Sequence, residues 1–160
     1  MNHTIRPQGT DFESRYRAGF VLSEHSARHL RRILRLHLAA ADLLEVADAA
    51  ELALTELVGN VVRHVPGRRC RMCFLLRPGA VRVEVADSCR RLPAPAPENM
   101  DASDEAETGR GLLLLQAVTD RWGAEPHPDG SGKTVWFECL AKPPTVPDFL
   151  SRAASPAPRP

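Results

Sequence analysis

Apolar residues recur at helical spacing in two segments of the first half of the chain. Between residues 24 and 39, apolar side chains return every three or four positions with arginines between them, which predicts an amphipathic helix. The same spacing predicts a second helix from about 44 to 65, where the pair Pro66-Gly67 ends it. A short strand is predicted before both helices, over Arg15–Val21.

The hydrophobic period then changes to two, which is typical of strands. Arg69–Arg77 and Ala80–Ala86 flank a Pro-Gly pair and predict a β-hairpin. A last strand is predicted over Thr134–Leu140, after a glycine-rich turn. Between the hairpin and this strand, Asp87–Thr108 is rich in proline and acidic residues and is long enough to be a lid loop. We expect a helix over Leu112–Thr119, opened by the glycines just before it.

This order of elements predicts an α+β fold. We expect a two-layer α/β sandwich in which a mixed, largely antiparallel sheet carries the helices on one face. The ordered domain is expected over residues 12–140. Residues 1–11 are expected to form a flexible tail, and residues 141–160 form a proline-rich one.

Length and charge restrict the function classes. The chain has 160 residues, enough for one domain with a core. Its net charge of +1 gives no general attraction to nucleic acid or to a membrane, so we expect neither as a partner. Residues 1–8 lack the apolar segment of a secretory signal, which favours a cytoplasmic location and reduced cysteines.

The second predicted helix carries a carboxylate and an amide one turn apart. Glu56 and Asn60 share a helix face, and the neighbouring Leu57 and Val58 show that this face borders the core. The amide oxygen is a hard ligand of the kind that Mg²⁺ prefers. The carboxylate can orient or deprotonate a nucleophile beside a phosphate. Such pairs are also common on solvated helix faces, so the pair by itself decides nothing.

Three further positions are compatible with nucleotide binding. Asp87, at the end of a predicted strand, can accept a hydrogen bond from the exocyclic amine of adenine, although aspartates also start ordinary turns. Gly109 and Gly111 let the backbone approach a phosphate at a helix N-terminus, although a G-x-G is as often a hinge. Thr134 would lie beside Asp87 if their strands are neighbours, although a β-branched residue in a strand is ordinary.

Four segments in this order resemble one known superfamily. ELALTELVGNVVRH, VRVEVADS, ETGRGLLLL and GKTVWFE are similar to the motifs of the histidine-kinase-like ATPases, which have the Bergerat fold. The resemblance covers about Phe12 to Leu140. Within the superfamily, the chain resembles the small stand-alone anti-sigma-factor serine kinases and their actinobacterial relatives. The resemblance implies ATP and Mg²⁺ as cofactors.

The resemblance also implies a role for each candidate residue. Glu56 would be the general base, Asn60 the Mg²⁺ ligand and Asp87 the adenine anchor. The remaining nucleotide contacts would come from Arg63, from a phosphate lid formed by Thr108, Gly109, Arg110 and Gly111, and from Thr134 beside Asp87 through water.

The adenine box departs from the family pattern D-x-G-x-G. The chain reads Asp87-Ser88-Cys89-Arg90-Arg91, with neither glycine, and a proline follows shortly after. Many small relatives share this loss. We therefore expect the departure to affect affinity and turnover rather than adenine recognition.

Three functions remain open. The first is a serine/threonine kinase that phosphorylates a small antagonist protein and binds a sigma factor, and so regulates transcription; Glu56 favours it because a pure binder needs no base. The second is an ATP-binding partner switch without phosphotransfer, which the missing glycines favour. A homodimer is compatible with either.

The third is a metal protein that uses Cys70 and Cys73 with Cys89 or His64. No second Cys pair follows this C-x-x-C. In a strand, positions three apart point to opposite faces, which argues against a shared metal.

Overall fold

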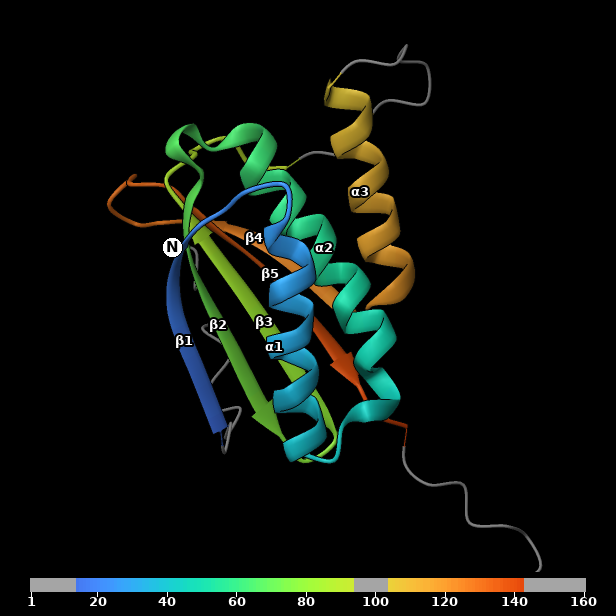
Figure 1. The fold of residues 1–160 in the computed structure, drawn as a ribbon. Helices are drawn as coiled ribbons and strands as arrows, with labels where there is room; N and C mark the ends of the chain where they lie inside the picture. Colours follow the sequence, from blue (N-terminus) through green and yellow to red (C-terminus); the bar gives the residue numbers. More distant parts are fainter. Residues whose placement is uncertain (1–13, 94–103, 143–160) are drawn as a thin grey trace, which may run out of the picture.

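The chain folds into two layers, a five-stranded sheet and three α-helices on one of its faces (Figure 1). The structure is a computed structural model, and it describes residues 14–93 and 104–142. The described strands are β1 (Ser14–Val21), β2 (Arg69–Arg77), β3 (Ala80–Asp87), β4 (Arg121–Pro126) and β5 (Lys133–Leu140), and the α-helices are α1 (Ser26–Ala40), α2 (Ala47–His64) and α3 (Asp104–Val118). The α+β two-layer prediction is confirmed.

The sheet has the order β1-β2-β3-β5-β4, and each neighbouring pair of described strands is antiparallel. The predicted hairpin is confirmed as β2 and β3. It turns at Gly79, whose positive φ of 75° suits a residue without Cβ. Where β3 ends, Asp87 lies between its register partners Cys70 on β2 and Lys133 on β5.

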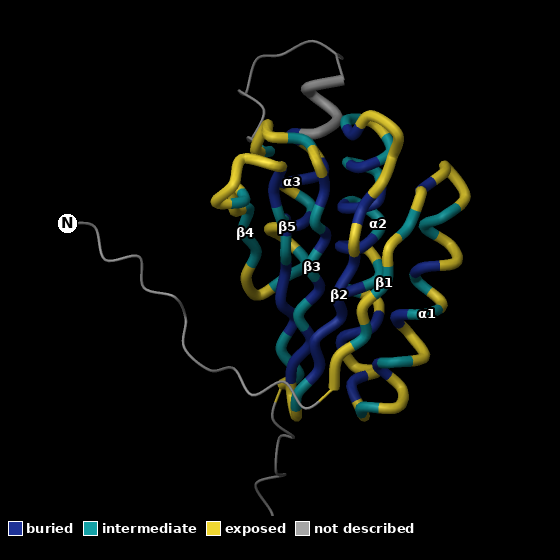
Figure 2. The backbone as a smooth tube through the Cα atoms, turned by 90° about the vertical axis from the view of Figure 1, so that its left-hand side faces the viewer, coloured by how far each residue is buried: buried dark blue, intermediate teal, exposed yellow. Residues whose placement is uncertain are grey.

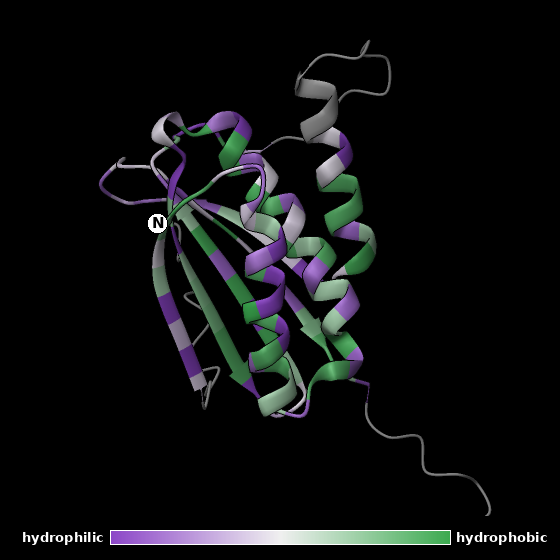
Figure 3. Ribbon diagram, in the orientation of Figure 1, coloured by the Kyte–Doolittle hydropathy of each residue, from purple (hydrophilic) through white to green (hydrophobic). Residues whose placement is uncertain are grey.

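The core lies between the sheet and the helices. Figure 2 shows buried positions concentrated in the central strands and recurring along the helices, and Figure 3 shows that the central strands are also rich in apolar residues. From the sheet, every second residue of the central strands contributes, among them Met72, Phe74, Val81, Val83, Val85, Val135 and Phe137. From the helices come Leu30, Leu34, Leu38, Leu54, Leu57 and Leu112. The periods read from the sequence therefore assign most core positions correctly.

Two elements differ from the sequence-based expectations. The third helix begins at Asp104 rather than at Leu112, so Gly109 and Gly111 lie inside it. Glutamate and alanine are good helix formers, and a glycine inside a helix costs only about 1 kcal/mol, so the residues before Gly109 extend the helix across both glycines. The strand β4 was not predicted, because its sequence RWGAEP contains Gly and Pro and lacks alternation; pairing with β5 makes it a strand.

Several expectations concern residues outside the described part. The middle of the predicted lid loop, residues 94–103, is one of these segments, whereas the last five residues of that loop belong to α3 and are helical. The flexible N-terminal tail and most of the proline-rich C-terminal one also lie outside the described part. Among the helices that the structure does describe, none is long and apolar enough to cross a membrane.

Candidate functional site

The candidate residues gather where α2 and β3 both approach their C-terminal ends, beside α3 (Figure 1). Glu56 and Asn60 are both half-buried on α2, while Leu57, Val58 and Val61 of the same helix are buried in the core. Packing of these apolar residues fixes the rotation of α2. It thereby places Glu56 and Asn60 on the border between core and surface, as the sequence predicts.

The structure brings Glu56 against the glycine motif of α3. A Cβ atom built on Gly111 would lie only 2.6 Å from Oε2 of Glu56, so the carboxylate rests directly on the α3 backbone. α2 and α3 pack closely here because position 111 has no side chain. Two motifs that are more than fifty residues apart in the sequence thus form one local site.

Asn60 is engaged by a neighbouring cation. Nη2 of Arg63 donates a hydrogen bond of 3.2 Å to Oδ1 of Asn60. The Arg63 guanidinium folds back over Gly59, where a Cβ would lie 3.1 Å from its Nη1. Arg63 is otherwise exposed. The amide oxygen that the sequence assigns to a metal thus already accepts a hydrogen bond from a cation, and its second lone pair has the capacity for another partner.

Asp87 is buried at the end of β3, on the sheet face that packs against the helices. Its Oδ1 accepts a hydrogen bond of 2.8 Å from the backbone N–H of Cys89. This local bond is the turn that an aspartate makes with the residue two positions on, so the chain turns here without the family's glycines. The same Oδ1 lies 2.9 Å from Nζ of Lys133 in a buried ion pair.

Thr134 is not beside Asp87. Its register partner on β3 is Ala86, so its side chain lies on the sheet face away from the helices. There its hydroxyl lies 3.0 Å from Nε2 of His127. Lys133 takes the place next to Asp87, and the sequence reasoning missed it. Counting back in twos along β5 from the apolar Phe137 and Val135 leads to Lys133, so the strand pattern held the signal.

The glycine motif lies within α3 and does not open it. Gly109 and Gly111 are buried and Arg110 is exposed, whereas the side chain of Thr108 lies outside the described part. Only the first four N–H groups of a helix are without an intrahelical partner, and in α3 these belong to residues before the motif. The expectation that the motif offers helix N-terminal N–H groups to a phosphate is therefore wrong. What Gly111 offers is a bare helix surface against Glu56.

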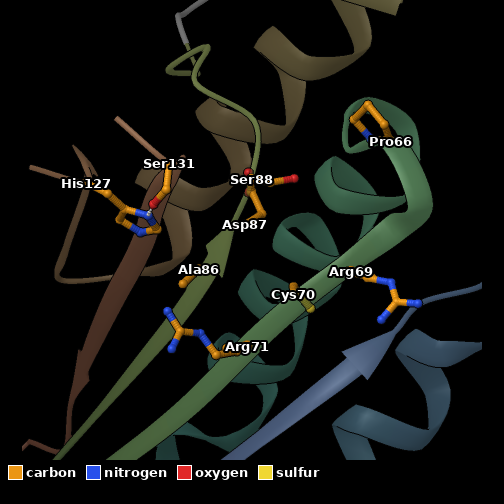
Figure 4. A pocket seen from close by; sticks show the side chains of 9 residues that line it. All are labelled: Pro66, Arg69, Cys70, Arg71, Ala86, Asp87, Ser88, His127 and Ser131. Carbon is orange, nitrogen blue, oxygen red and sulfur yellow. Dashed lines mark hydrogen bonds between the residues drawn. The ribbon is translucent and has the colours of Figure 1, made fainter. Parts of the chain in front are cut away.

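An open pocket of about 330 Å³ lies at the same end of the sheet (Figure 4). It is lined by Pro66, Arg69, Cys70, Arg71, Ala86, Asp87, Ser88, His127 and Ser131. Arg71 and Ala86 are register partners on the face away from the helices, so most of this pocket lies across the sheet from Glu56 and Asn60. Asp87 is therefore one of the residues that line this pocket, although its side chain faces the helix layer.

The cysteines of the alternative metal-protein interpretation do not share a metal site. Cys70 faces the helix layer beside Asp87, and Cys73 lies three positions on along β2, on the opposite face. Burial raises the pKa of the Cys70 thiol to about 11, and the nearby charge of Asp87 adds to the rise. Burial likewise raises the pKa of Cys139 to about 12. Metal binding needs thiolates, which both environments disfavour, and the described residues contain no cluster of three metal-binding side chains.

The donor set fits a magnesium nucleotide better than it fits a protein-held metal. Mg²⁺ takes one or two protein oxygens and fills its remaining positions with water and phosphate oxygens. The amide oxygen of Asn60 and the nearby carboxylate of Glu56 are oxygens of this kind. At the other end, the carboxylate of Asp87 is an acceptor suited to an amine.

Comparison with known proteins agrees with this geometry. Residues 20–139 match the family described as the histidine kinase-like ATPase domain. The chain is also 34% identical over 108 residues to an uncharacterized protein of Streptomyces coelicolor, a match that covers 66% of this chain and 97% of that protein. The matched range contains α1, α2 and α3 and the strands β2, β3 and β4, with all but the last residue of β5 and only the end of β1. The family supports ATP as the ligand. The chain belongs to the histidine kinase-like ATPase domain family.

Proposed function

We propose that this protein is a regulatory serine/threonine kinase of the anti-sigma-factor type, which uses Mg·ATP to phosphorylate a small antagonist protein in the cytoplasm. The observation that supports it most is the position of Glu56. This carboxylate lies one helical turn before Asn60 and against the α3 backbone at Gly111. A binder without phosphotransfer needs no carboxylate at that place.

Each residue has a role in this proposal. Asp87 accepts the exocyclic amine of adenine, and Asn60 offers its amide oxygen to Mg²⁺, which supplies charge neutralisation for the phosphates. Arg63, already at Asn60, neutralises phosphate charge from the exposed side. Glu56 accepts the proton of the incoming serine hydroxyl. Gly111, the last residue of the proposed phosphate lid, is the part of α3 on which the Glu56 carboxylate rests.

A partner switch that binds ATP without transferring phosphate is the second candidate. Cys89 and Arg91 stand where the family commonly has the two glycines of its adenine box, and Lys133 already pairs with the Asp87 carboxylate. Both features weaken adenine binding and slow turnover. In either case a sigma factor and its antagonist are the partners that we propose, and a homodimer is compatible with both.

Two measurements test the proposal. Calorimetry with ATP, in the presence and absence of Mg²⁺, should show binding that depends on the metal. Radiolabelled ATP should then transfer its γ-phosphate to a serine of a small antagonist protein, and a Ser→Ala antagonist should stay unlabelled. Binding without transfer to any cognate antagonist would establish the switch instead, and absence of nucleotide binding would exclude both functions.

The contact between Glu56 and Gly111 makes a separate prediction. Gly111→Ala should leave the free energy of unfolding within about 1 kcal/mol of the parent, because alanine favours a helix by that amount and the carboxylate can swing aside. Phosphotransfer should fall by at least about tenfold, since even a 1 Å displacement of a reacting group can cost about a hundredfold. Denaturant unfolding and a phosphotransfer assay measure the two quantities. Gly19→Ala, on β1, is the control, because its Cβ would lie 4.0 Å from the carbonyl of Cys70 and touch nothing in the site.

A further inference from the structure

Lys133 occupies a position that neither the sequence motifs nor the family match assigns to any role. It is the register partner of Asp87 on the neighbouring strand, and both side chains face the helix layer. The exposed fraction is 8% for the Lys133 side chain and 4% for that of Asp87. A lysine this deeply buried is unusual unless it is paired, and here its partner is the candidate adenine anchor.

Two hydrogen bonds hold the ammonium of Lys133 at the end of β3. Nζ donates to Oδ1 of Asp87 at 2.9 Å and to the carbonyl oxygen of Cys89 at 3.1 Å. Oδ1 also accepts the backbone N–H of Cys89. The ammonium therefore bridges the anchoring carboxylate and the turn that follows it, at the point where a base would reach the strand end.

The backbone around this pair has little freedom. A Cβ on Gly132 would overlap the carbonyl oxygen of Asp87, so the start of β5 is pressed against the end of β3. The main chain of Lys133 is also held by its pairing with Asp87 on β3, so rotation of the side chains separates the ammonium from the carboxylate.

We propose that Lys133 is an affinity- and specificity-determining residue that competes with the nucleotide base for Asp87. The inference rests on the proposed adenine role of Asp87. The exocyclic amine of adenine is a neutral donor, whereas the Lys133 ammonium adds the attraction of a full positive charge to its hydrogen bond with the carboxylate. Adenine therefore gains less from Asp87 than it would gain from a carboxylate without a cation.

The base specificity follows from the same geometry. Adenine offers a donor at its six-position, whereas hypoxanthine offers an acceptor there. The donor competes with Lys133 for the carboxylate, but the acceptor can take a hydrogen bond from the ammonium. Lys133 thus lowers the preference for ATP over inosine triphosphate.

The test is Lys133→Met, which removes the ammonium and keeps an unbranched apolar side chain that reaches as far as the lysine Cε. Calorimetry should show at least about tenfold tighter Mg·ATP binding than in the parent, the scale of one charge-assisted hydrogen bond. Affinity for inosine triphosphate should stay equal or fall. Lys142→Met is the matched control, because it makes the same chemical change at the only other lysine, which is exposed; its ATP affinity should equal that of the parent.

Lys133→Gln is the second variant, since it keeps a neutral donor for the buried carboxylate if the methionine variant fails to fold. It should also bind Mg·ATP more tightly than the parent, and ATP should raise its melting temperature by more. Parental or weaker ATP binding by the folded Lys133 variants would overturn the competition while leaving the proposed function intact. If neither the parent nor the folded variants bind Mg·ATP, the proposed function and this inference both fail.

Discussion

Replacing Glu56 by glutamine should lower phosphotransfer by about 10²–10⁴-fold, the usual contribution of a general base, while ATP binding stays near the parental value. Glutamine keeps the shape of the side chain and its contact with Gly111. It cannot accept a proton from a serine hydroxyl. In phosphoryl transfer the protein mainly positions groups and stabilises charge, so a loss confined to the rate identifies the missing base.

The comparison needs a control on the same helix. Glu51→Gln provides it, because Glu51 pairs with Arg35 of α1. Its phosphotransfer rate should match that of the parent, with only a small loss of stability from a partly exposed ion pair. A parental rate in Glu56→Gln would show that the base lies elsewhere.

Replacing Asn60 by alanine should remove most of the Mg²⁺-dependent part of ATP binding. Even residues that only support a metal ligand contribute about 10–100-fold to metal affinity, and a direct ligand should contribute at least as much. Asn60 is half-buried on the border of the core rather than within it, so the fold should persist. Calorimetry with and without Mg²⁺, together with circular dichroism, measures both quantities.

The contribution of Arg63 to ATP binding must be distinguished from that of Asn60, since the two side chains are hydrogen-bonded. Arg63→Ala removes that bond and leaves the amide oxygen in place. It should weaken ATP binding at low ionic strength but retain the dependence on Mg²⁺. Asn60→Asp should also retain it, because a carboxylate oxygen is again a hard ligand. If Asn60→Ala keeps the full metal dependence, Asn60 is not the ligand.

The two hydrophobic periods were sufficient to predict the layers. The leucines of α1 form an apolar face of the helix, and the alternating valines of β3 form an apolar face of the sheet. Packing the helix on the sheet buries both faces. Glu56, Asn60 and Asp87 could be located for the same reason, since each has a fixed offset from core residues on its own element.

What the sequence left undetermined depends on contacts between elements. The choice between Lys133 and Thr134 is a matter of strand parity, and a shift of one residue sends a side chain to the other face. The strand character of β4 comes from pairing with β5, because its own sequence contains Gly123 and Pro126. The start of α3 depends on the helix-forming residues before Gly109, whose preference outweighs the two glycines as a helix boundary.

The order of the strands also affects how the molecule behaves at high concentration. Among the strands that the structure describes, β1 and β4 are the outer ones, and an exposed strand edge is a template for pairing with another chain. Arg15 and Arg17 project from β1, so edge-to-edge association of two copies would bring like charges together. β4 is six residues long and ends in Pro126, which has no N–H to donate. Growth of the sheet into fibrils is therefore opposed at both edges, and replacing both arginines by valine should make the purified protein prone to aggregation.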